Sequence, residues 1–423
     1  MRLNSAKITR RGALKALAAT AAVGMMPGAA FGQSIFSNIQ RNRILAETDR
    51  EANSRIALDA ISGNDPIISL STEYNLQRVA EYYRRLVAAG GWPEVPRAVY
   101  GLVLGQRSSA VNDLRRYLVN TGDLPGTSDM SEIFDAPLDV AVRGFQARHG
   151  LAISGQVDEF TYYAMAVPAQ TRLNQIELNL QRVRNLEGLL GNDRYVVVNI
   201  PAATIEAIEA EQVAQRHTAI VGRIDRQTPI LQSRIHQINF NPFWTVPRSI
   251  IERDIIPFMR ENPNYLTEYN IRILDGSGRE IPPGQIDWNS NQAVNYTLRQ
   301  DPGAQNSMGH VKINFHNPHA VYLHDTPQQS LFTDIQRFHS SGCVRVDRVD
   351  ELVAWVLRNN GYDIISVNTT FASGERRDVE VQSPPRILTT YVTAWANRNG
   401  VVSFRDDVYE FDASGRTSFP ELA

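Results

Sequence analysis

Apolar residues recur at helical spacing in the first part of the chain. Residues 34–89 have a polar, helical pattern, and its clearest stretch, residues 74–87, ends at the glycines and proline of residues 90–93. Glycine and proline interrupt helices, because glycine costs more backbone entropy to order and proline lacks the amide hydrogen. The pattern predicts a helical scaffold over residues 33–99, to which we assign no chemistry.

Shorter helical stretches follow, separated by turn signals. Three of them predict a compact module over residues 100–168, and a later one predicts a helical linker over residues 169–193. The stretches are residues 110–119, 138–149 and 159–166 in the module and residues 173–190 in the linker.

The period then changes to that of β-strands. Residues 195–200 are a β-branched run closed by proline, residues 217–222 are a second run, and residues 235–240 alternate. With further strands at residues 311–315 and 320–323, they predict a mostly antiparallel β-domain over residues 194–370.

Two features interrupt or follow these strands. Between residues 247 and 290 helical and proline-rich pieces predict an insertion or lid, and residues 349–357 predict a helix. Residues 371–423 are predicted to complete the scaffold. The chain as a whole is therefore predicted to have an α+β multidomain fold.

Composition places the chain among ordinary globular proteins. It has 423 residues, of which 43% are hydrophobic and 21% charged, with a formal net charge of -2. This length accommodates two or three domains. The near-neutral charge lacks the attraction for phosphate backbones or anionic lipids, so we expect no nucleic-acid partner.

The first 32 residues have the pattern of an export signal. A basic start containing Arg10 and Arg11 precedes an apolar run at residues 16–26, and small residues at Ala30 and Gly32 permit cleavage before residue 33. The paired arginines resemble a twin-arginine signal, which predicts a periplasmic protein. A membrane anchor is the alternative, but the run is shorter than the roughly 20 residues that span a bilayer, and no later segment is long and apolar enough.

The chain has one cysteine, Cys343. An internal disulfide is therefore excluded. An unpaired thiol in an exported protein risks oxidation, so its presence indicates a chemical role. A buried, inert cysteine is the alternative.

The residues around Cys343 supply the groups that acyl transfer needs. His324 ends a predicted strand 19 residues before the cysteine and can take its proton. Ser341 and Gly342 form a small-residue turn whose N–H groups can stabilise an oxyanion. A helix soon after the cysteine is expected to lower the thiol pKa through its dipole, and Arg345 can bind a carboxylate.

This segment resembles the signature of the L,D-transpeptidase catalytic domain, in which a histidine precedes a Ser-(His or Ser)-Gly-Cys-x-Arg motif. The resemblance covers most of residues 34–410, whose sequence is similar to the large Gram-negative branch of the family. Proteins of that branch join a helical scaffold, a peptidoglycan-binding domain, a β-rich catalytic domain and a capping subdomain. It is carried by Asn199-Ile200-Pro201, Val221-Gly222, Thr228-Pro229, Asn241-Pro242-Phe243-Trp244, Arg299-Gln300-Asp301-Pro302-Gly303, Asn306, Gly309, Lys312 and Tyr391-Val392-Thr393-Ala394-Trp395.

The resemblance implies the site and the reaction. Cys343 is the implied nucleophile and His324 the general acid/base, while Arg345, Tyr322 and Asn306 are expected to bind substrate, although Tyr322 is also a candidate for core packing. The implied reaction releases D-alanine from a peptidoglycan stem tetrapeptide through a thioester and forms a 3-3 cross-link. A cysteine hydrolase or L,D-carboxypeptidase, a lipoprotein-anchoring enzyme and an inactive wall-binding protein remain alternatives.

Two positions depart from the wider family. Ser341 stands where many members have a second histidine, and Asp325 where many have glycine. Five of the eight histidines lie between His310 and His339, but no metal-binding spacing such as HExxH occurs, so we expect neither a metal nor a cofactor.

Residues 100–168 resemble the peptidoglycan-binding domain, and the expected partners are therefore stem peptides and glycan. The resemblance rests on Leu114, Leu118, Phe134-Asp135, Ala141-Val142, Phe145-Gln146, His149-Gly150-Leu151, Gly155, Val157 and Thr161. A helical spacer with the same apolar core is the alternative. His149 is predicted to cap a helix rather than to bind a ligand.

Overall fold

A computed structural model describes residues 63–126, 131–186 and 194–419. The predicted signal peptide and the polar helical pattern before residue 63 lie outside the described residues. Within the described part of the chain, no helix is both long enough and apolar enough to cross a membrane.

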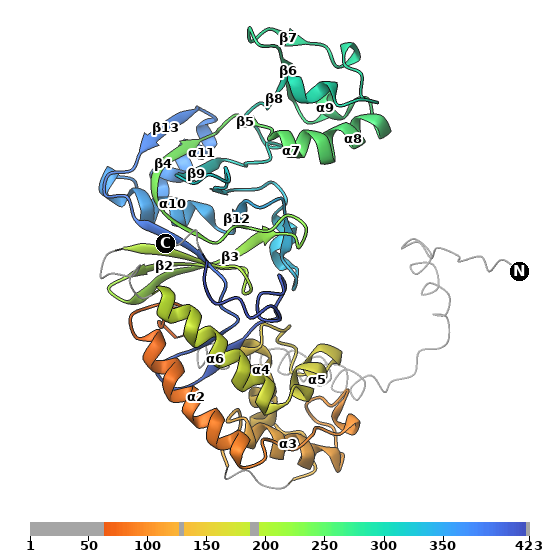
Figure 1. The fold of residues 1–423 in the computed structure, drawn as a ribbon, viewed down its shortest axis with the longest axis vertical. Helices are drawn as coiled ribbons and strands as arrows, with labels where there is room; N and C mark the ends of the chain where they lie inside the picture. Colours follow the sequence, from red (N-terminus) through yellow and green to blue (C-terminus); the bar gives the residue numbers. More distant parts are fainter. Residues whose placement is uncertain (1–62, 127–130, 187–193, 420–423) are drawn as a thin grey trace, which may run out of the picture. The chain divides into compact units, whose positions relative to one another are not determined.

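The helical part consists of a two-helix scaffold and a small module (Figure 1). Helices α2 (Thr72–Ala88) and α6 (Ala169–Leu186) pack against each other, and α6 corresponds to the predicted linker. The module contains η1 (Arg97–Val99), α3 (Ala110–Asn120), α4 (Ala136–Arg148) and α5 (Glu159–Ala166) around a core of its own.

Side chains fix the helix ends of this module. Asp135 and Asp158 accept hydrogen bonds from the backbone N–H groups of Leu138 and Thr161, which caps α4 and α5. His149 is the C-cap of α4, as predicted, and its Nδ1–H donates to the carbonyl oxygen of Phe145 at 2.8 Å. The polar residues of the peptidoglycan-binding resemblance therefore include structural caps.

The β-rich part contains one sheet whose ends meet. Its order is β11-β3-β12-β10-β9-β4-β14-β1-β2, β13 pairs with β4, and β2 also pairs with β3. Most pairings are antiparallel; β1 with β14, β10 with β12 and β11 with β3 are parallel. The strands are β1 (Tyr195–Asn199), β2 (Thr204–Glu209), β3 (Gln212–Gly222), β4 (Leu231–Phe240), β9 (Val311–Phe315), β10 (Leu323–His324), β11 (Phe338–Ser340), β12 (Val344–Val346), β13 (Arg377–Glu380) and β14 (Arg386–Thr390).

Short helices accompany the sheet. They are η6 (Gln329–Thr333), α10 (Val349–Leu357), η7 (Arg358–Asn360) and α11 (Ile364–Ser373), and α10 matches the predicted helix. The predicted strand at residues 320–323 is shorter than expected, because Ala320 has a left-handed backbone with φ of 53° and Asn317 bonds the backbone of Val321 on both sides.

A capping subdomain with its own core interrupts the sheet between β4 and β9 (Figure 1, green). The predicted insertion at residues 247–290 lies inside it, but its core extends from Trp244 to Met308. Its elements are β5 (Trp244–Thr245), α7 (Arg248–Ile250), the π-helix η3 (Ile251–Ile255), α8 (Ile256–Glu261), α9 (Tyr265–Glu268), β6 (Ile271–Leu274), β7 (Glu280–Ile281), η4 (Pro283–Gln285), η5 (Gln292–Asn295) and β8 (Thr297–Gln300), and its strands pair in the order β5-β8-β6-β7.

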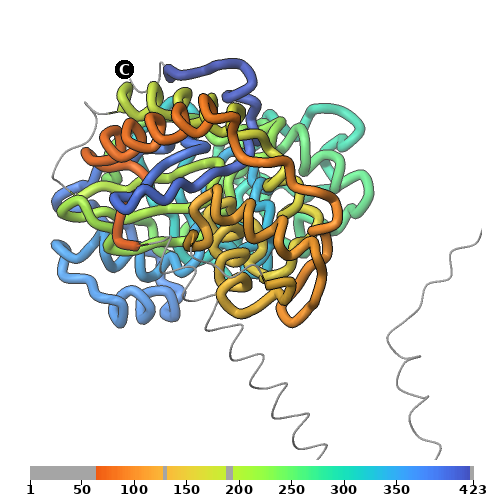
Figure 2. Tube along the Cα trace, turned by 90° about the horizontal axis from the view of Figure 1, so that it is seen from below, coloured from red at the N-terminus to blue at the C-terminus, as the bar shows by residue number. Residues whose placement is uncertain are grey.

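The end of the described chain does more than complete the scaffold. The hairpin of β15 (Ala394–Ala396) and β16 (Val402–Phe404) packs on α2 and α6, and Figure 2 shows this dark blue segment beside α2. However, β14 lies between β4 and β1 in the main sheet. The predicted completion of the scaffold by residues 371–423 thus describes the β15–β16 hairpin, whereas β14 is a buried strand of the main sheet.

Candidate active site

Strand alternation brings four predicted site residues to one face. In the parallel pairing of β10 with β12, Leu323 lies opposite Val344, and both side chains are fully buried in the core. Side chains of adjacent residues point to opposite faces of a sheet. Tyr322, His324, Cys343 and Arg345 therefore share the other face, where all four line one cavity.

This cavity has a volume of about 270 Å³ and lies between the sheet and the capping subdomain. The cap contributes an apolar and aromatic wall that includes Trp244, Phe258, Tyr265 and Tyr269. Such a mixture of an apolar wall with a few polar groups is typical of sites that bind small or extended ligands.

The environment of Cys343 keeps the thiol protonated. Burial raises the pKa of this thiol, while hydrogen bonding to Tyr322 and the positive charges of Lys312 and Arg345 act in the opposite direction. The expected lowering of the thiol pKa by the following helix was wrong, because burial outweighs the opposing effects and strand β12 separates the cysteine from α10.

The imidazole of His324 is also neutral. Burial, followed by the charge of Arg345, lowers the pKa of His324 to about 3. Nδ1 lies 2.5 Å from the carbonyl oxygen of Asp325, and since a carbonyl only accepts, Nδ1 carries the proton. Nε2 is therefore free to accept one. Among the described residues no hydrogen bond joins His324 to Cys343.

Polar residues from distant segments fix the cysteine loop, residues 340–343. Ser340 Oγ donates to the carbonyl oxygen of Cys343 at 2.5 Å and accepts from the N–H of Gly342 at 3.1 Å. Thr228 Oγ1 donates to the carbonyl oxygen of Gly342 at 2.9 Å and accepts from the N–H of Gly222 at 2.8 Å. Gly342 has φ of +113°, a conformation that favours glycine.

The loop arrangement changes the predicted oxyanion donors. Because the N–H of Gly342 is occupied by Ser340, it is not free to stabilise an oxyanion. The described part of the chain supplies no acceptor for the N–H groups of Ser341 and Cys343. These two N–H groups are the better candidates.

Tyrosines near the end of the chain support the same loop, and sequence reasoning missed them. The hydroxyl of Tyr409 donates to the carbonyl oxygen of Gly222 at 2.6 Å and accepts from the N–H of Thr228 at 3.2 Å. The hydroxyl of Tyr391 in turn accepts from the N–H of Tyr409 at 2.8 Å. Nothing in the local sequence pattern connects residues so far apart.

The predicted substrate-binding residues have different environments. Arg345 lines the cavity and donates to Gln328 Oε1 at 2.8 Å, and Tyr322 lines the cavity beside the thiol while Lys312 lies over its ring at 4.2 Å. Asn306, in contrast, is 1% exposed, and its amide donates to the carbonyl oxygens of Pro242 and Asp301 and accepts from the N–H of Met308. The prediction that Asn306 binds substrate was wrong, because its hydrogen-bonding groups are used within the fold.

We expect Asn306→Ala to destabilise the protein rather than to alter substrate binding. Three buried backbone groups lose their partner, which is expected to cost about 3 kcal/mol of the free energy of unfolding. Urea unfolding measures this change. Gln305→Ala, at an exposed neighbouring position, is the control and should change stability by less than about 0.5 kcal/mol. An Asn306→Ala protein of unchanged stability would contradict the structural role.

An ion pair joins the capping subdomain to the cysteine loop. Arg226 donates to both carboxylate oxygens of Asp254 in η3, at 2.5 and 3.0 Å, and to Ser341 Oγ at 2.9 Å. Both residues are mostly shielded from solvent, and bidentate arginine–carboxylate pairs are geometrically specific. Arg226 is therefore a positioning residue for the loop beside Cys343.

We expect Asp254→Asn to lower the rate of Cys343 acylation by about tenfold, because the loop loses its fixed connection to the cap. Stopped-flow measurement of acylation tests this. Asp225→Asn is a matched control, since Asp225 also faces Arg226, at 3.8 Å, but is 68% exposed. Equal rates for the two variants would contradict the positioning role.

The remaining histidines make local contacts. Asp325 Oδ2 accepts from the backbone N–H of His310 at 2.9 Å and interacts with its Nδ1 at 3.0 Å, which raises the pKa of His310. A Cβ at position 309 would lie 2.2 Å from the same oxygen, which explains why glycine precedes His310. His339 contacts Asp334. Within the described ranges, no group of three metal-ligating side chains converges.

Comparison with known families agrees with this architecture. Residues 193–379 match the L,D-transpeptidase catalytic domain, and residues 107–165 match the "Putative peptidoglycan binding domain". The chain therefore contains an L,D-transpeptidase catalytic domain of the YkuD family and a domain of the peptidoglycan-binding family. The predicted multidomain α+β fold is confirmed.

Individual proteins similar to this chain are also named L,D-transpeptidases. A "Putative L,D-transpeptidase" of Haemophilus influenzae is 33% identical over 252 residues, which are 59% of this chain and 50% of the relative. This chain thus spans half the length of that curated relative. Similar solved structures include an L,D-transpeptidase from Stackebrandtia nassauensis, which is 13% identical, covers 73% of this chain and 99% of its own, and has a TM-score of 0.26. An L,D-transpeptidase from Mycobacterium smegmatis is 13% identical, covers 47% of this chain and 59% of its own, and has a TM-score of 0.23. The closer assignment to the large Gram-negative branch stays a prediction.

Proposed function

We propose that this protein is a periplasmic L,D-transpeptidase that cross-links peptidoglycan through a thioester on Cys343. The observation that carries the proposal is the placement of Cys343 and His324 on one face of two paired strands, opening into a single cavity of an L,D-transpeptidase catalytic domain. The export-signal pattern of residues 1–32 supports the location.

In the first half-reaction, sulfur of Cys343 attacks the carbonyl carbon of the third residue of a stem tetrapeptide. Its proton passes to Nε2 of His324, which Nδ1 bonding leaves free. The oxygen of the tetrahedral intermediate is stabilised by the N–H groups of Ser341 and Cys343. The bond to the terminal D-alanine then breaks, the proton leaves on its amine, and a thioester remains.

The second half-reaction repeats these steps with an amine as nucleophile. The amine attacks the thioester carbonyl and gives a proton to His324, the carbon–sulfur bond breaks, and the sulfur regains that proton. The thiol of Cys343 and the imidazole of His324 are both neutral before the first half-reaction, so neither has to be maintained as a buried charge in the resting site.

The acceptor that we propose is the side-chain amine of a diaminopimelate in a second stem, which gives a 3-3 cross-link. The capping subdomain supports this choice, because its aromatic wall extends the cavity beyond the thiol and provides surface for a second peptide. Water as acceptor would give an L,D-carboxypeptidase, and a lipoprotein lysine would give anchoring.

The test is mass spectrometry of the mature protein incubated with disaccharide-tetrapeptide, with Cys343→Ala as control. Dimers linked 3-3 in the unsubstituted protein alone are the expected result. Release of D-alanine without dimers would favour hydrolysis or exchange. Unchanged fragments would contradict the proposed function and favour a wall-binding protein.

A further inference from the structure

A second cavity, of about 240 Å³, lies where α5, α6 and the end of β16 meet. None of its lining residues is shared with the cavity that contains Cys343. The peptidoglycan-binding family match ends at residue 165, within α5, so this cavity lies at the edge of that domain.

Two arginines of this cavity, Arg172 and Arg405, form no direct ion pair among the described residues. Arg172 Nη1 donates to Gln175 Oε1 at 2.9 Å, and Arg405 Nη1 donates to the carbonyl oxygens of Arg148 and Phe404. Within the described ranges, no carboxylate lies within 4.0 Å of either guanidinium, but Asp406 lines the same cavity and its charge partly offsets the effect of burial on both pKa values. Burial lowers the pKa of both arginines to about 10. An anion binds favourably to such buried cations when the geometry is good and further hydrogen bonds satisfy both groups.

The fold holds these two guanidinium groups in place. Arg172 stacks over the ring of Phe404 at 4.6 Å, and Arg405 stacks over the ring of Trp395 at 4.9 Å. Gly150 makes room for Arg405, because a Cβ there would lie 2.6 Å from its Nε. A guanidinium that is already oriented loses less entropy when it binds a carboxylate.

Exposed aromatic rings border the arginines. Phe160 and Tyr163 of α5 are 61% and 59% exposed and lie three residues apart, so they share one helix face. Exposed rings beside desolvated cations suit a ligand that has both an apolar or sugar part and a carboxylate.

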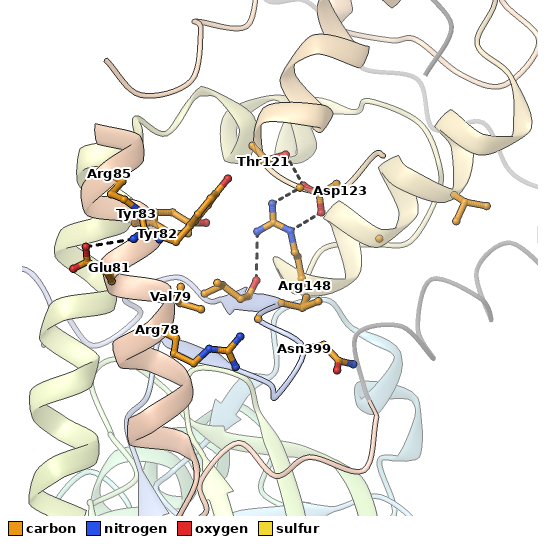
Figure 3. Close-up of a pocket in the computed structure, with 16 residues that line it drawn as sticks. Arg78, Val79, Glu81, Tyr82, Tyr83, Arg85, Thr121, Asp123, Arg148 and Asn399 are labelled. Carbon is orange, nitrogen blue, oxygen red and sulfur yellow. Dashed lines mark hydrogen bonds and ion pairs between the residues drawn. The ribbon is translucent and has the colours of Figure 1, made fainter. Parts of the chain in front are cut away.

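Another cavity is a weaker candidate for an anion. It has about 690 Å³ and lies between α2, α4 and the β15–β16 hairpin (Figure 3). Figure 3 shows Arg148 bound to the carboxylate of Asp123. Arg148 donates to both oxygens of this carboxylate at 2.7 Å and also to the carbonyl oxygen of Val402. Its buried cation is therefore already neutralised.

We infer that the smaller cavity is a second wall-binding site, which takes a carboxylate of a peptidoglycan stem peptide against Arg172 and Arg405 and packs the attached unit on Phe160 and Tyr163. This inference rests on the proposed function, because that function makes peptidoglycan the partner. The site holds the chain on the wall while the Cys343 cavity acts on another stem.

The experiment measures binding of disaccharide-tetrapeptide by calorimetry, in the full chain carrying Cys343→Ala to prevent turnover. The double change Phe160→Ala and Tyr163→Ala is expected to weaken binding by about tenfold, and Arg172→Gln by at least as much. Tyr74→Ala, at a 63% exposed tyrosine of α2 outside the cavity, is the control and should bind normally. Thermal unfolding of each variant identifies any loss of fold.

A second measurement separates this inference from the proposed function. The double variant with Cys343 restored should release D-alanine from free tetrapeptide at the normal rate but bind less to intact sacculi. Unchanged binding of the fragment and of sacculi by the double variant would overturn the second site. A loss of binding that affects only phosphate-bearing polymers would also overturn it, because the anion would then be a phosphate and not a stem carboxylate. Absence of D-alanine release from the unsubstituted protein would refute the transpeptidase proposal, while weaker binding by the variants would still support the site.

Discussion

Cys343→Ala is expected to abolish acylation and to lower turnover of tetrapeptide by about 10⁴-fold or more, because no other described side chain in the cavity is a thiol. A carbapenem, which the family resemblance makes an expected acylating agent, provides a direct measurement. The unsubstituted protein should gain the mass of one carbapenem, and the variant should gain none.

The fold should survive this change. Cys343 is only partly buried at the residue level and its side chain faces the cavity rather than the core, so the midpoint of thermal unfolding should stay within a few degrees. Cys343→Ser, which keeps a hydroxyl of similar size, should also lose acylation. A carbapenem adduct on the alanine variant would contradict the assignment of the nucleophile.

His324→Gln is expected to lower the rate of acylation by about 10²- to 10⁴-fold, the usual contribution of a general base. Glutamine can still donate to the carbonyl oxygen of Asp325, so the loop should retain its shape, but it cannot take the proton of the thiol. Stopped-flow measurement with a carbapenem follows the step that this proton transfer limits.

The pH profile of the unsubstituted protein gives an independent test. Because burial lowers the pKa of His324 to about 3, the imidazole is neutral and able to accept a proton throughout the range from pH 5 to pH 7. The acylation rate should therefore be nearly constant over this range. A histidine with the ordinary pKa of about 6.5 would instead lose roughly 25-fold, and such a fall would contradict the proposed protonation state.

The lowered pKa of His324 also makes the folded protein less stable at low pH. The unfolded chain binds a proton at the ordinary histidine pKa, whereas the folded chain does not until the pH is near 3. Unfolding is therefore favoured as the pH falls from about 6.5 towards 3. His149 and His217 have lowered pKa values for the same reason, burial, and add to this acid sensitivity.

The sequence predicted those helices and strands that are determined by the pattern of consecutive residues. β9 and α10 have the predicted bounds, because strict alternation and helical spacing are carried by consecutive residues. The placement of Tyr322, His324, Cys343 and Arg345 on one face also follows from alternation once the two strands are paired. The roles of these residues remain predictions.

Other features depend on contacts between distant segments, which the pattern does not contain. Asn306 has a side chain of the kind that often binds ligands. Its structural role is visible only from its burial and its hydrogen bonds to Pro242 and Asp301. The short segment between Cys343 and the predicted helix was assigned no element, but pairing with β10 and β3 makes it a strand. Tyr409 could not be connected with Thr228 before the fold was known.

The position of β14 also constrains when the molecule can become active. β14 pairs with both β4 and β1, and Tyr409 then bonds the turn that supports the cysteine loop. Since β14 and Tyr409 follow Cys343 in the sequence, a nascent chain that has only reached the cysteine has its thiol but lacks the support that orients it. Translation must therefore pass residue 409 before the cysteine loop can acquire this support.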